Sequence, residues 1–206
     1  MGEKAAVSDL EMDLSKAILE ADFKDAINHG ILVSNLAVLI AKQLNMEEAF
    51  INEISIAGMV HDIGKLKLSK YLYGRRRGAL AIEEIKYVRM HSTFSYEVMK
   101  KMQFSEFIQS SVYHHHENFD GSGYPDNLVG TAIPFGARVL RCCDVFAALV
   151  SKRPYRDAFD IETALDLMID EVKNFDMRVF LAFLEVVHSS EFEEIREFVT
   201  LCNKAT

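Results

Sequence analysis

The sequence predicts an all-α protein with a single domain. Apolar residues recur three and four positions apart along most of the chain, which is the spacing of one helix face. No segment shows the clear period-two alternation that marks a strand, and there is no internal repeat. Half of the 206 residues are hydrophobic, so a buried core of ordinary size is available.

The predicted helices follow one another along the whole chain. They are expected at residues 10–23, 27–44, 47–60, 82–102, 105–116, 134–150, 161–172, 177–187 and 191–201. Pro134 suits the first turn of its helix, where its missing N–H costs no hydrogen bond. We expect residues 1–22 to form an N-terminal helix or linker and residues 23–206 to form the domain. Two loops stand out: 71–80 carries three arginines, and 117–134 is long for a helix connection, which favours a functional role.

Composition argues against several classes of protein. The net charge of −8 argues against a general binder of nucleic-acid polymers, which needs a basic face. No apolar run approaches the ~20 residues of a membrane span, and the N-terminus is too polar and acidic for a secretory signal. Three cysteines, two of them adjacent, make no disulfide framework, so we expect a cytoplasmic location.

A set of histidines and aspartates carries the functional signal. It runs in the order His29, His61–Asp62, His91, His114–His115–His116 and Asp144. Each member alone has an ordinary explanation, because a lone histidine is more often a satisfied core residue or an exposed one. The whole set together has no such ordinary explanation. Imidazole and carboxylate in combination suit Fe, Mn, Zn or Ni. Two such ions bridged by one carboxylate form a hydrolytic centre, so the sequence predicts a binuclear metal site.

Local spacing adds detail to this site. Asp25 and His29 are four residues apart, so on a helix they share one face. His61 and Asp62 diverge by about 100° unless the helix unwinds there, which suits an aspartate that bridges two ions while the histidine binds one. Lys65 would place an ammonium beside the ions. Its ordinary explanation is charge complementarity at a helix C-terminus.

Four motifs resemble a known family. They are HDIGK at 61–65, HHENFDGSGYP at 115–125, ARVLRCCDVFAAL at 137–149 and RPYR at 153–156. In this order and spacing they resemble the HD-GYP family of the HD metal-dependent phosphohydrolase superfamily, over roughly residues 25–185. The resemblance implies an HD-domain helical bundle with a metal centre in its core. It also implies a metal-dependent phosphodiesterase that hydrolyses cyclic di-GMP.

The resemblance further implies roles for single residues. The implied ligands of two divalent ions, iron or manganese, are His29, His61, Asp62, His91, His115, His116 and Asp144. Asp62 would bridge the two ions, whereas His114 precedes the family's histidine pair and is not an implied ligand. Lys65 is implied to contact the scissile phosphate, and Arg153 and Arg156 to bind the substrate's phosphates. The signature loop, associated with partner contacts as much as with chemistry, consists of Gly123, Tyr124 and Pro125.

The chain also departs from the family's pattern. Members with three metals carry glutamate four residues before the first histidine, where this chain has Asp25. The family usually has a second aspartate three residues after the Asp144 position, where this chain has Ala147. The family also has a glycine after the His91 position, where this chain has Ser95. None of these changes removes a ligand of a two-metal site. We therefore expect two tightly bound ions and a weak or empty third position.

Our hypothesis is a phosphodiesterase that opens cyclic di-GMP to pGpG through a metal-activated hydroxide. A second cut to GMP would follow if the linear product rebinds. Two alternatives stay open. One is an HD phosphohydrolase acting on another cyclic dinucleotide or nucleotide. The other is a non-catalytic module that binds cyclic di-GMP and contacts a diguanylate cyclase (GGDEF) domain or another signalling protein.

Overall fold

The protein is a helical bundle built around one long helix. The computed structural model describes residues 2–68, 82–153 and 156–204. The arginine-rich loop at 71–80 and the two middle residues of the RPYR motif lie outside the described residues. In the described part the all-α prediction is confirmed: the regular elements are helices, and the only pairing of extended backbone is an isolated bridge between Arg153 and Arg156.

The helices follow the predicted order, except that the two helices expected at 10–23 and 27–44 are one continuous helix. The elements are α1 (Gly2–Gln43), α2 (Glu48–Val60), η1 (Ile63–Leu68), α4 (Ile82–Arg89), α5 (His91–Lys101), α6 (Glu106–Tyr113), η2 (Gly130–Ala132), α7 (Phe135–Val150), α8 (Ile161–Asp170), η3 (Val172–Asn174), α9 (Met177–Val187), η4 (Ser190–Phe192) and α10 (Glu193–Lys204). Side chains cap three of the helices at their N-termini, since Ser105, Asp160 and Asp176 each accept a hydrogen bond from a first-turn backbone N–H.

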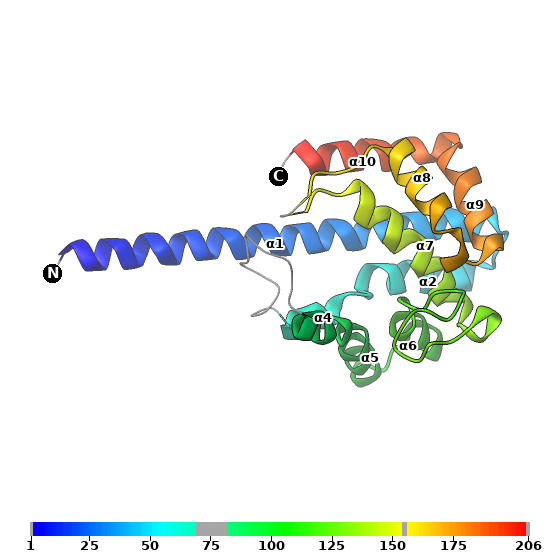
Figure 1. The fold of residues 1–206 in the computed structure, drawn as a ribbon, viewed down its shortest axis with the longest axis horizontal. Coiled ribbons are helices and arrows are strands. Elements are labelled where there is room, and N and C mark those ends of the chain that lie inside the picture. Colours follow the sequence, from blue (N-terminus) through cyan, green and yellow to red (C-terminus); the bar gives the residue numbers. More distant parts are fainter. Residues whose placement is uncertain (1, 69–81, 154–155, 205–206) are drawn as a thin grey trace.

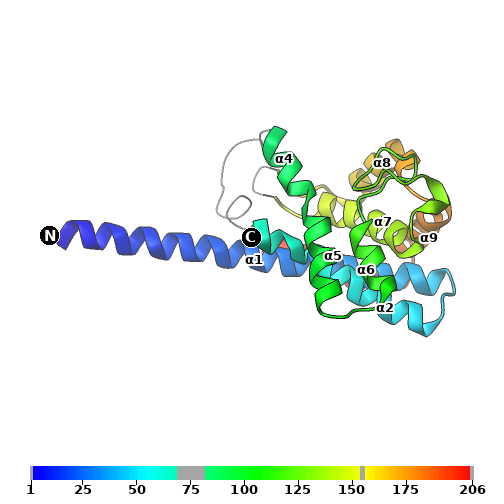
Figure 2. The ribbon, with the colours of Figure 1, turned by 90° about the horizontal axis from the view of Figure 1, so that it is seen from below.

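The C-terminal half of α1 is the centre of the bundle. In Figure 1 it lies between α2, α4, α5 and α6 on one side and α8, α9 and α10 on the other, while its N-terminal half projects from the body. Figure 2, turned by 90°, shows the same projection. The helix is continuous across residue 22, so the expected boundary between residues 1–22 and 23–206 falls inside α1; that division stays a prediction. No helix among the described residues is long and apolar enough to cross a membrane.

Aromatic packing closes the core on the α7 side of α1. Leu36 and Ile40 of α1 are fully buried in one cluster with residues of α7, α9 and η4. The Phe146 ring lies 5.1 Å from that of Phe183 and 6.0 Å from that of Phe192, centroid to centroid. Such buried aromatic pairs contribute more than their area alone. This core holds α7 against α1, which brings two distant parts of the ligand set together.

The prediction of a single helix at 82–102 was wrong. The structure has two helices, with the break at Met90 between α4 and α5. The His91 ring bonds to the carbonyl of Val88, and the Ser92 hydroxyl donates to the carbonyl of Arg89. These side chains take the carbonyls that a continuing helix would use, which is how short polar side chains compete with helical hydrogen bonding. As a result, His91 stands at the first position of α5 instead of within a long helix.

Candidate metal centre

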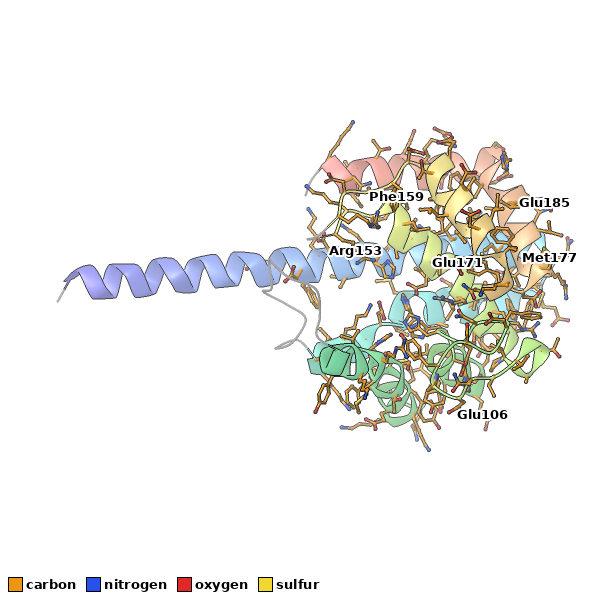
Figure 3. The ribbon with its side chains drawn as sticks, in the orientation of Figure 1. Glu106, Arg153, Phe159, Glu171, Met177 and Glu185 are labelled. Atoms are coloured by element: carbon orange, nitrogen blue, oxygen red, sulfur yellow. The ribbon has the colours of Figure 1, made fainter. Side chains whose placement is uncertain are left out.

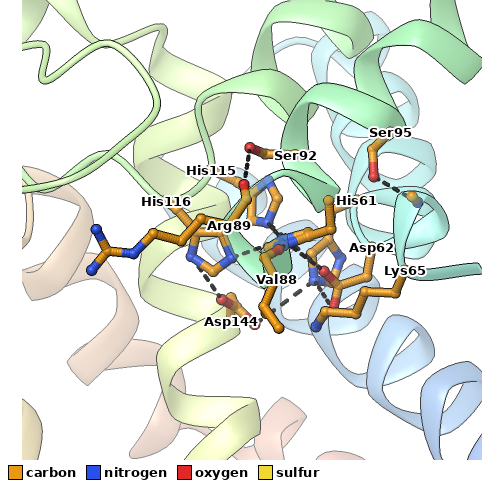
Figure 4. A network of polar contacts seen from close by, with 12 residues as sticks. His61, Asp62, Lys65, Val88, Arg89, Ser92, Ser95, His115, His116 and Asp144 are labelled. Atoms are coloured by element: carbon orange, nitrogen blue, oxygen red, sulfur yellow. Dashed lines mark hydrogen bonds and ion pairs between the residues drawn. The ribbon is translucent and has the colours of Figure 1, made fainter. Parts of the chain in front are cut away.

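Seven predicted ligands meet in one place, although they come from five parts of the chain (Figure 4). Each stands at a helix end or on a face turned toward the core: His29 on α1, His61 and Asp62 after α2, His91 at the start of α5, His115 and His116 after α6, and Asp144 on α7. They form two groups whose ligand atoms lie within 4.8 Å of one another. The first consists of His29, His61 and Asp144, and the second of Asp62, His91, His115 and His116.

Hydrogen bonds to nearby backbone carbonyls orient three of the imidazoles. The Nδ1 atoms of His61, His91 and His115 each bond to a carbonyl three residues earlier, at 2.7, 2.6 and 2.6 Å. Because a carbonyl only accepts, Nδ1 must carry the proton, and Nε2 of the neutral ring keeps a lone pair. Those three Nε2 atoms converge on the centre. This is the usual way in which a second partner sets the tautomer of a metal-ligating histidine.

The chain unwinds where Asp62 needs to diverge from His61. The helix predicted at 47–60 is confirmed, since α2 ends at Val60 and His61 caps it. Asp62 then leads into the 3-10 helix η1. A Cβ at Gly64 would lie 2.2 Å from the carbonyl oxygen of His91, so glycine is needed for η1 to approach α5 this closely. Ser95, at a position where the family has glycine, accepts a hydrogen bond from the Gly64 N–H at 2.9 Å.

The Asp62 carboxylate lies between the two groups. Its Oδ1 is 3.2 Å from Nε2 of His91, and its Oδ2 is 3.3 Å from Nε2 of His61. Asp144 divides its oxygens in a similar way, with Oδ1 3.0 Å from Nε2 of His29 and Oδ2 3.8 Å from Nδ1 of His116. Asp62 therefore has one oxygen for each group, as the bridging role requires.

Imidazole nitrogens face one another at short distances in this cluster, so protons alone cannot satisfy all of them. Nε2 of His91 lies 3.2 Å from Nε2 of His115 and 3.0 Å from Nε2 of His116. Burial, followed by the neighbouring imidazoles, lowers the pKa of His115 to about 3. Burial opposes charge on His61 as well, but the Asp62 and Asp144 carboxylates outweigh it and raise the pKa of that ring to about 10.

Buried polar atoms without partners point the same way. Within the described part of the chain, Nε2 of His61 and Oδ1 of Asp62 have no hydrogen-bond partner. An unsatisfied buried polar group is costly, and native proteins retain few of them without a reason. Divalent cations would satisfy both atoms and neutralise the two carboxylates. Imidazole nitrogen and carboxylate oxygen suit such ions, so the residues present fit a two-metal centre.

Lys65 lies directly beside this centre. Its ammonium forms an ion pair with Oδ2 of Asp62, and its side chain is 31% exposed. Burial would raise the pKa of Asp62, but Lys65 first and then His61 lower it well below its usual value. The Lys65 ammonium therefore contacts Asp62 and is also open to solvent, which is compatible with contact to a phosphate.

The two arginines of the RPYR motif have different surroundings. The Arg156 guanidinium donates to the carbonyls of Ala148 and Leu149 at the end of α7, at 2.8 and 3.1 Å, and to that of Asp157 at 2.7 Å. It thus caps α7, and a role in binding substrate would require these bonds to break. Arg153 instead lines a small cavity of about 30 Å³ together with Asp25 and His29. Figure 3 shows Arg153 at the edge of the body, near α1.

Asp25 belongs to neither ligand group in the described residues. It shares the cavity with His29, whose Nδ1 is buried and without a hydrogen-bond partner there. Burial, and then Asp22, raise the pKa of Asp25. His114 also lies outside both groups, with Nδ1 3.6 Å from a carboxylate oxygen of Glu117.

The signature loop is tied to the metal centre, which sequence reasoning did not show. The Tyr124 ring stacks on His116 at 4.7 Å and 25°. The buried Glu117 carboxylate accepts hydrogen bonds from the backbone N–H groups of Asp126 and Leu128, at 2.7 and 3.1 Å. A Cβ at Gly123 would lie 2.2 Å from the backbone nitrogen of Asn118, so only glycine fits there. A glutamate directly after a histidine pair was the available signal, since a carboxylate there can hold the following loop.

Comparisons with known proteins show the family of the chain. A family model described as HD domain matches residues 13–179. The chain is 36% identical over 157 residues to the cyclic di-GMP phosphodiesterase response regulator RpfG of Xanthomonas campestris, covering 74% of this chain and 41% of that protein. It is 32% identical over 178 residues to 3′3′-cGAMP-specific phosphodiesterase 1 of Vibrio cholerae, covering 83% of this chain and 41% of that protein. The chain therefore spans less than half the length of either relative.

Two solved structures share the fold. Bd1817, an HDG"Y"P protein from Bdellovibrio bacteriovorus, superposes with a TM-score of 0.65 at 16% identity, covering 80% of this chain and 53% of that one. A cyclic GMP-AMP-specific phosphodiesterase of Vibrio cholerae (V-cGAP3) gives 0.65 at 16% identity, covering 92% and 53%. The resemblance seen in the motifs is thereby confirmed, and since the family model spans most of its length, the chain belongs to the HD domain family.

Proposed function

We propose that this chain is a metal-dependent phosphodiesterase that hydrolyses a cyclic dinucleotide, with cyclic di-GMP as the first candidate. The observation that carries the proposal is the position of Asp62, with one oxygen facing each of two imidazole groups. A site of this kind suits hydrolysis of a phosphodiester. The names of the relatives, among them a cyclic di-GMP phosphodiesterase at 36% identity, support the substrate class.

Two divalent ions are the proposed cofactors. The residues that would hold them are His29, His61, Asp62, His91, His115, His116 and Asp144. Bound there, the ions would lower the pKa of water and neutralise charge on the phosphate. Iron is the first candidate and manganese the second, as the resemblance to the HD-GYP family implies. The two ligand groups in the described residues offer imidazole and carboxylate, which suit both metals.

The chain's own residues would orient the reaction. Three backbone-bonded histidines keep their Nε2 atoms turned inward, so the ligand geometry exists before the ions arrive. Lys65 holds Oδ2 of Asp62 and is partly exposed, so its ammonium would stabilise negative charge on the phosphate oxygens. Arg153 is the proposed contact to a substrate phosphate from the α1 side. The expected first product is pGpG.

The 3′3′ cyclic GMP-AMP dinucleotide is the second candidate substrate. The relative of Vibrio cholerae that is 32% identical over 83% of this chain is named as specific for it. The test is anaerobic purification, metal analysis of the protein, and chromatography of digests of both dinucleotides. Cleavage of cyclic di-GMP at the higher kcat/KM supports the first proposal. Faster cleavage of cyclic GMP-AMP would replace it, and tight binding of either without turnover would show a non-catalytic module.

A GGDEF domain is the proposed protein partner, through the outer face of the signature loop. Val129 is 61% exposed, lies four residues after the signature loop in the same connection at 117–134, and belongs to neither ligand group. Val129→Asp should weaken capture of a diguanylate cyclase domain while hydrolysis persists; unchanged capture would argue against this partner face. Tyr124→Ala does not separate the two roles, because its ring contacts His116. The cytoplasmic location remains part of the proposal, supported by three free cysteines.

A further inference from the structure

Arg89, an arginine outside the RPYR motif, contacts the signature loop beside the metal centre. Arg89 is exposed at the end of α4, and its guanidinium carbon lies 5.0 Å from the centroid of the Tyr124 ring. That ring stacks on His116. Figure 4 shows the Arg89 side chain running past His116 and away from the other ligands. A guanidinium held on an aromatic face keeps its N–H groups free to donate in its own plane.

A second arginine lies on the same side. Arg141 is three residues before Asp144 on α7, and its Nε donates to Oδ1 of Asn118 at 2.9 Å. Asn118 directly follows Glu117 at the start of the loop 117–134 that contains the signature loop. Among the described residues, neither Arg89 nor Arg141 forms an ion pair with a carboxylate, unlike Arg138, which pairs with Asp176.

These arginines and Lys65 contact different parts of the site. Lys65 binds Oδ2 of Asp62, the oxygen nearer His61. Arg89 instead lies over the Tyr124 ring that stacks on His116, and Arg141 bonds to Asn118, two residues after His116. Cations therefore contact different parts of the site in a chain of net charge −8. Arg156 is not available for the same purpose without uncapping α7.

We propose that Arg89 and Arg141 bind the second phosphodiester of a cyclic dinucleotide while the first lies at the metal ligands; the inference rests on the proposed function. A cyclic dinucleotide carries two phosphodiesters on one ring, so a centre that cleaves one must accommodate the other. Guanidinium groups match phosphate oxygens in geometry and charge. The two arginines thus determine preference for a cyclic dinucleotide over a substrate with a single phosphodiester.

The test compares a substrate with two phosphodiesters and one with a single phosphodiester. Arg89→Ala and Arg141→Ala should each raise KM for cyclic di-GMP about tenfold, the loss expected for one hydrogen bond to a charged group, with kcat nearly unchanged. Hydrolysis of bis(p-nitrophenyl) phosphate should stay at the wild-type rate. Arg89→Lys should recover part of the loss. Arg178→Ala is the matched control, because that exposed guanidinium lies 5.5 Å from the Phe135 ring, away from the ligands, and it should change neither substrate.

The outcomes separate this inference from the proposed function. An unchanged KM in Arg89→Ala, or an equal loss on both substrates, would overturn the inference while leaving the phosphodiesterase in place. If the wild type cleaves bis(p-nitrophenyl) phosphate but no cyclic dinucleotide, the proposed function fails. The arginines are then tested by equilibrium binding of cyclic di-GMP to the manganese-loaded protein. About tenfold weaker binding by Arg89→Ala supports the inference, and equal binding overturns it.

Discussion

Asp62 is the residue on which both halves of the centre depend. One of its oxygens faces His91 and the other faces His61, so a single carboxylate offsets the charge of two ions. Asp62→Asn keeps the shape of the side chain but removes the negative charge and replaces one oxygen by a non-ligating nitrogen. We expect metal content to fall from two ions per chain to below one, and turnover to fall at least about a hundredfold. Elemental analysis and a hydrolysis assay check this, and two tightly held ions in the variant would contradict the bridging role.

The histidine triplet provides its own matched control. His116 contacts His91 Nε2 at 3.0 Å and belongs to the second group, whereas His114 belongs to neither. His116→Ala should therefore lose metal and abolish turnover. His114→Ala should retain both, because its ring faces Glu117. Both variants are measured for metal per chain and for hydrolysis. A fully active His116→Ala protein with two ions bound would remove His116 from the ligand set.

Asp25 tests the number of ions. Aspartate reaches about 1.5 Å less far than glutamate, and metal–oxygen distances tolerate only about ±0.2 Å. The structure places Asp25 in a cavity beside His29 and outside both ligand groups. We expect two ions per chain, accumulation of pGpG, and little effect of Asp25→Ala on the first cut. Asp25→Glu should raise third-site occupancy and speed the second cut. Three fully occupied sites in the wild type, with Asp25 as a ligand, would contradict this.

At the scale of elements, the 3-10 helix η1 positions Asp62 against α5. A Cβ at Gly64 would lie 2.2 Å from the His91 carbonyl and 2.6 Å from the Ser95 nitrogen, both of them backbone atoms. Gly64→Ala must therefore push η1 away from α5, which separates Asp62 from His91. We expect a loss of about 1–3 kcal/mol in the free energy of unfolding together with lower metal content. Leu66→Ala, at an exposed position of the same element, is the control. Wild-type stability and metal content in Gly64→Ala would show that this contact is not needed.

At the scale of the whole molecule, the buried cluster makes stability of the metal-free protein depend on pH. Burial lowers the pKa of His29, His91, His115 and His116 below the ordinary value of 6.5. Below pH 6.5 the unfolded chain binds protons at these positions and the folded chain does not, so acid favours unfolding. His61, whose pKa is raised to about 10, is protonated in both states below pH 6.5 and stabilises the fold there; its contribution is lost as pH rises from 6.5 toward 10.

We therefore expect metal-free protein to be most stable near pH 6.5 to 7. Its Tm should fall as pH is lowered from 6.5 to 5, and also as it is raised toward 10. Thermal unfolding of chelator-treated protein, followed by circular dichroism across this range, checks the prediction. Metal-loaded protein should have a higher Tm at pH 7, because ligands that bind the folded state stabilise it. A Tm that is flat between pH 5 and 6.5 would show that these histidines are not buried as neutral rings.

The sequence by itself determined the fold class, and the ligand set that it predicts rests on the resemblance of its motifs to the HD-GYP family. Helical spacing of apolar residues reports which face of a helix is buried, and that information is local. Imidazole and carboxylate recurring in this order indicate a metal site, and the resemblance to the HD-GYP family implies which of them are ligands. The approximate positions of most helices followed from the same local signals.

Only the tertiary structure decided how the predicted ligands and the side chains around them are arranged. The break between α4 and α5 depends on side chains of His91 and Ser92 taking backbone carbonyls, which apolar spacing does not encode. The division of Asp62 between two groups, the capping of α7 by Arg156 and the path from Arg89 through Tyr124 to His116 join segments far apart in the chain. Such contacts follow from packing in three dimensions, because spacing along a chain specifies the face of an element but not the side chain that meets it.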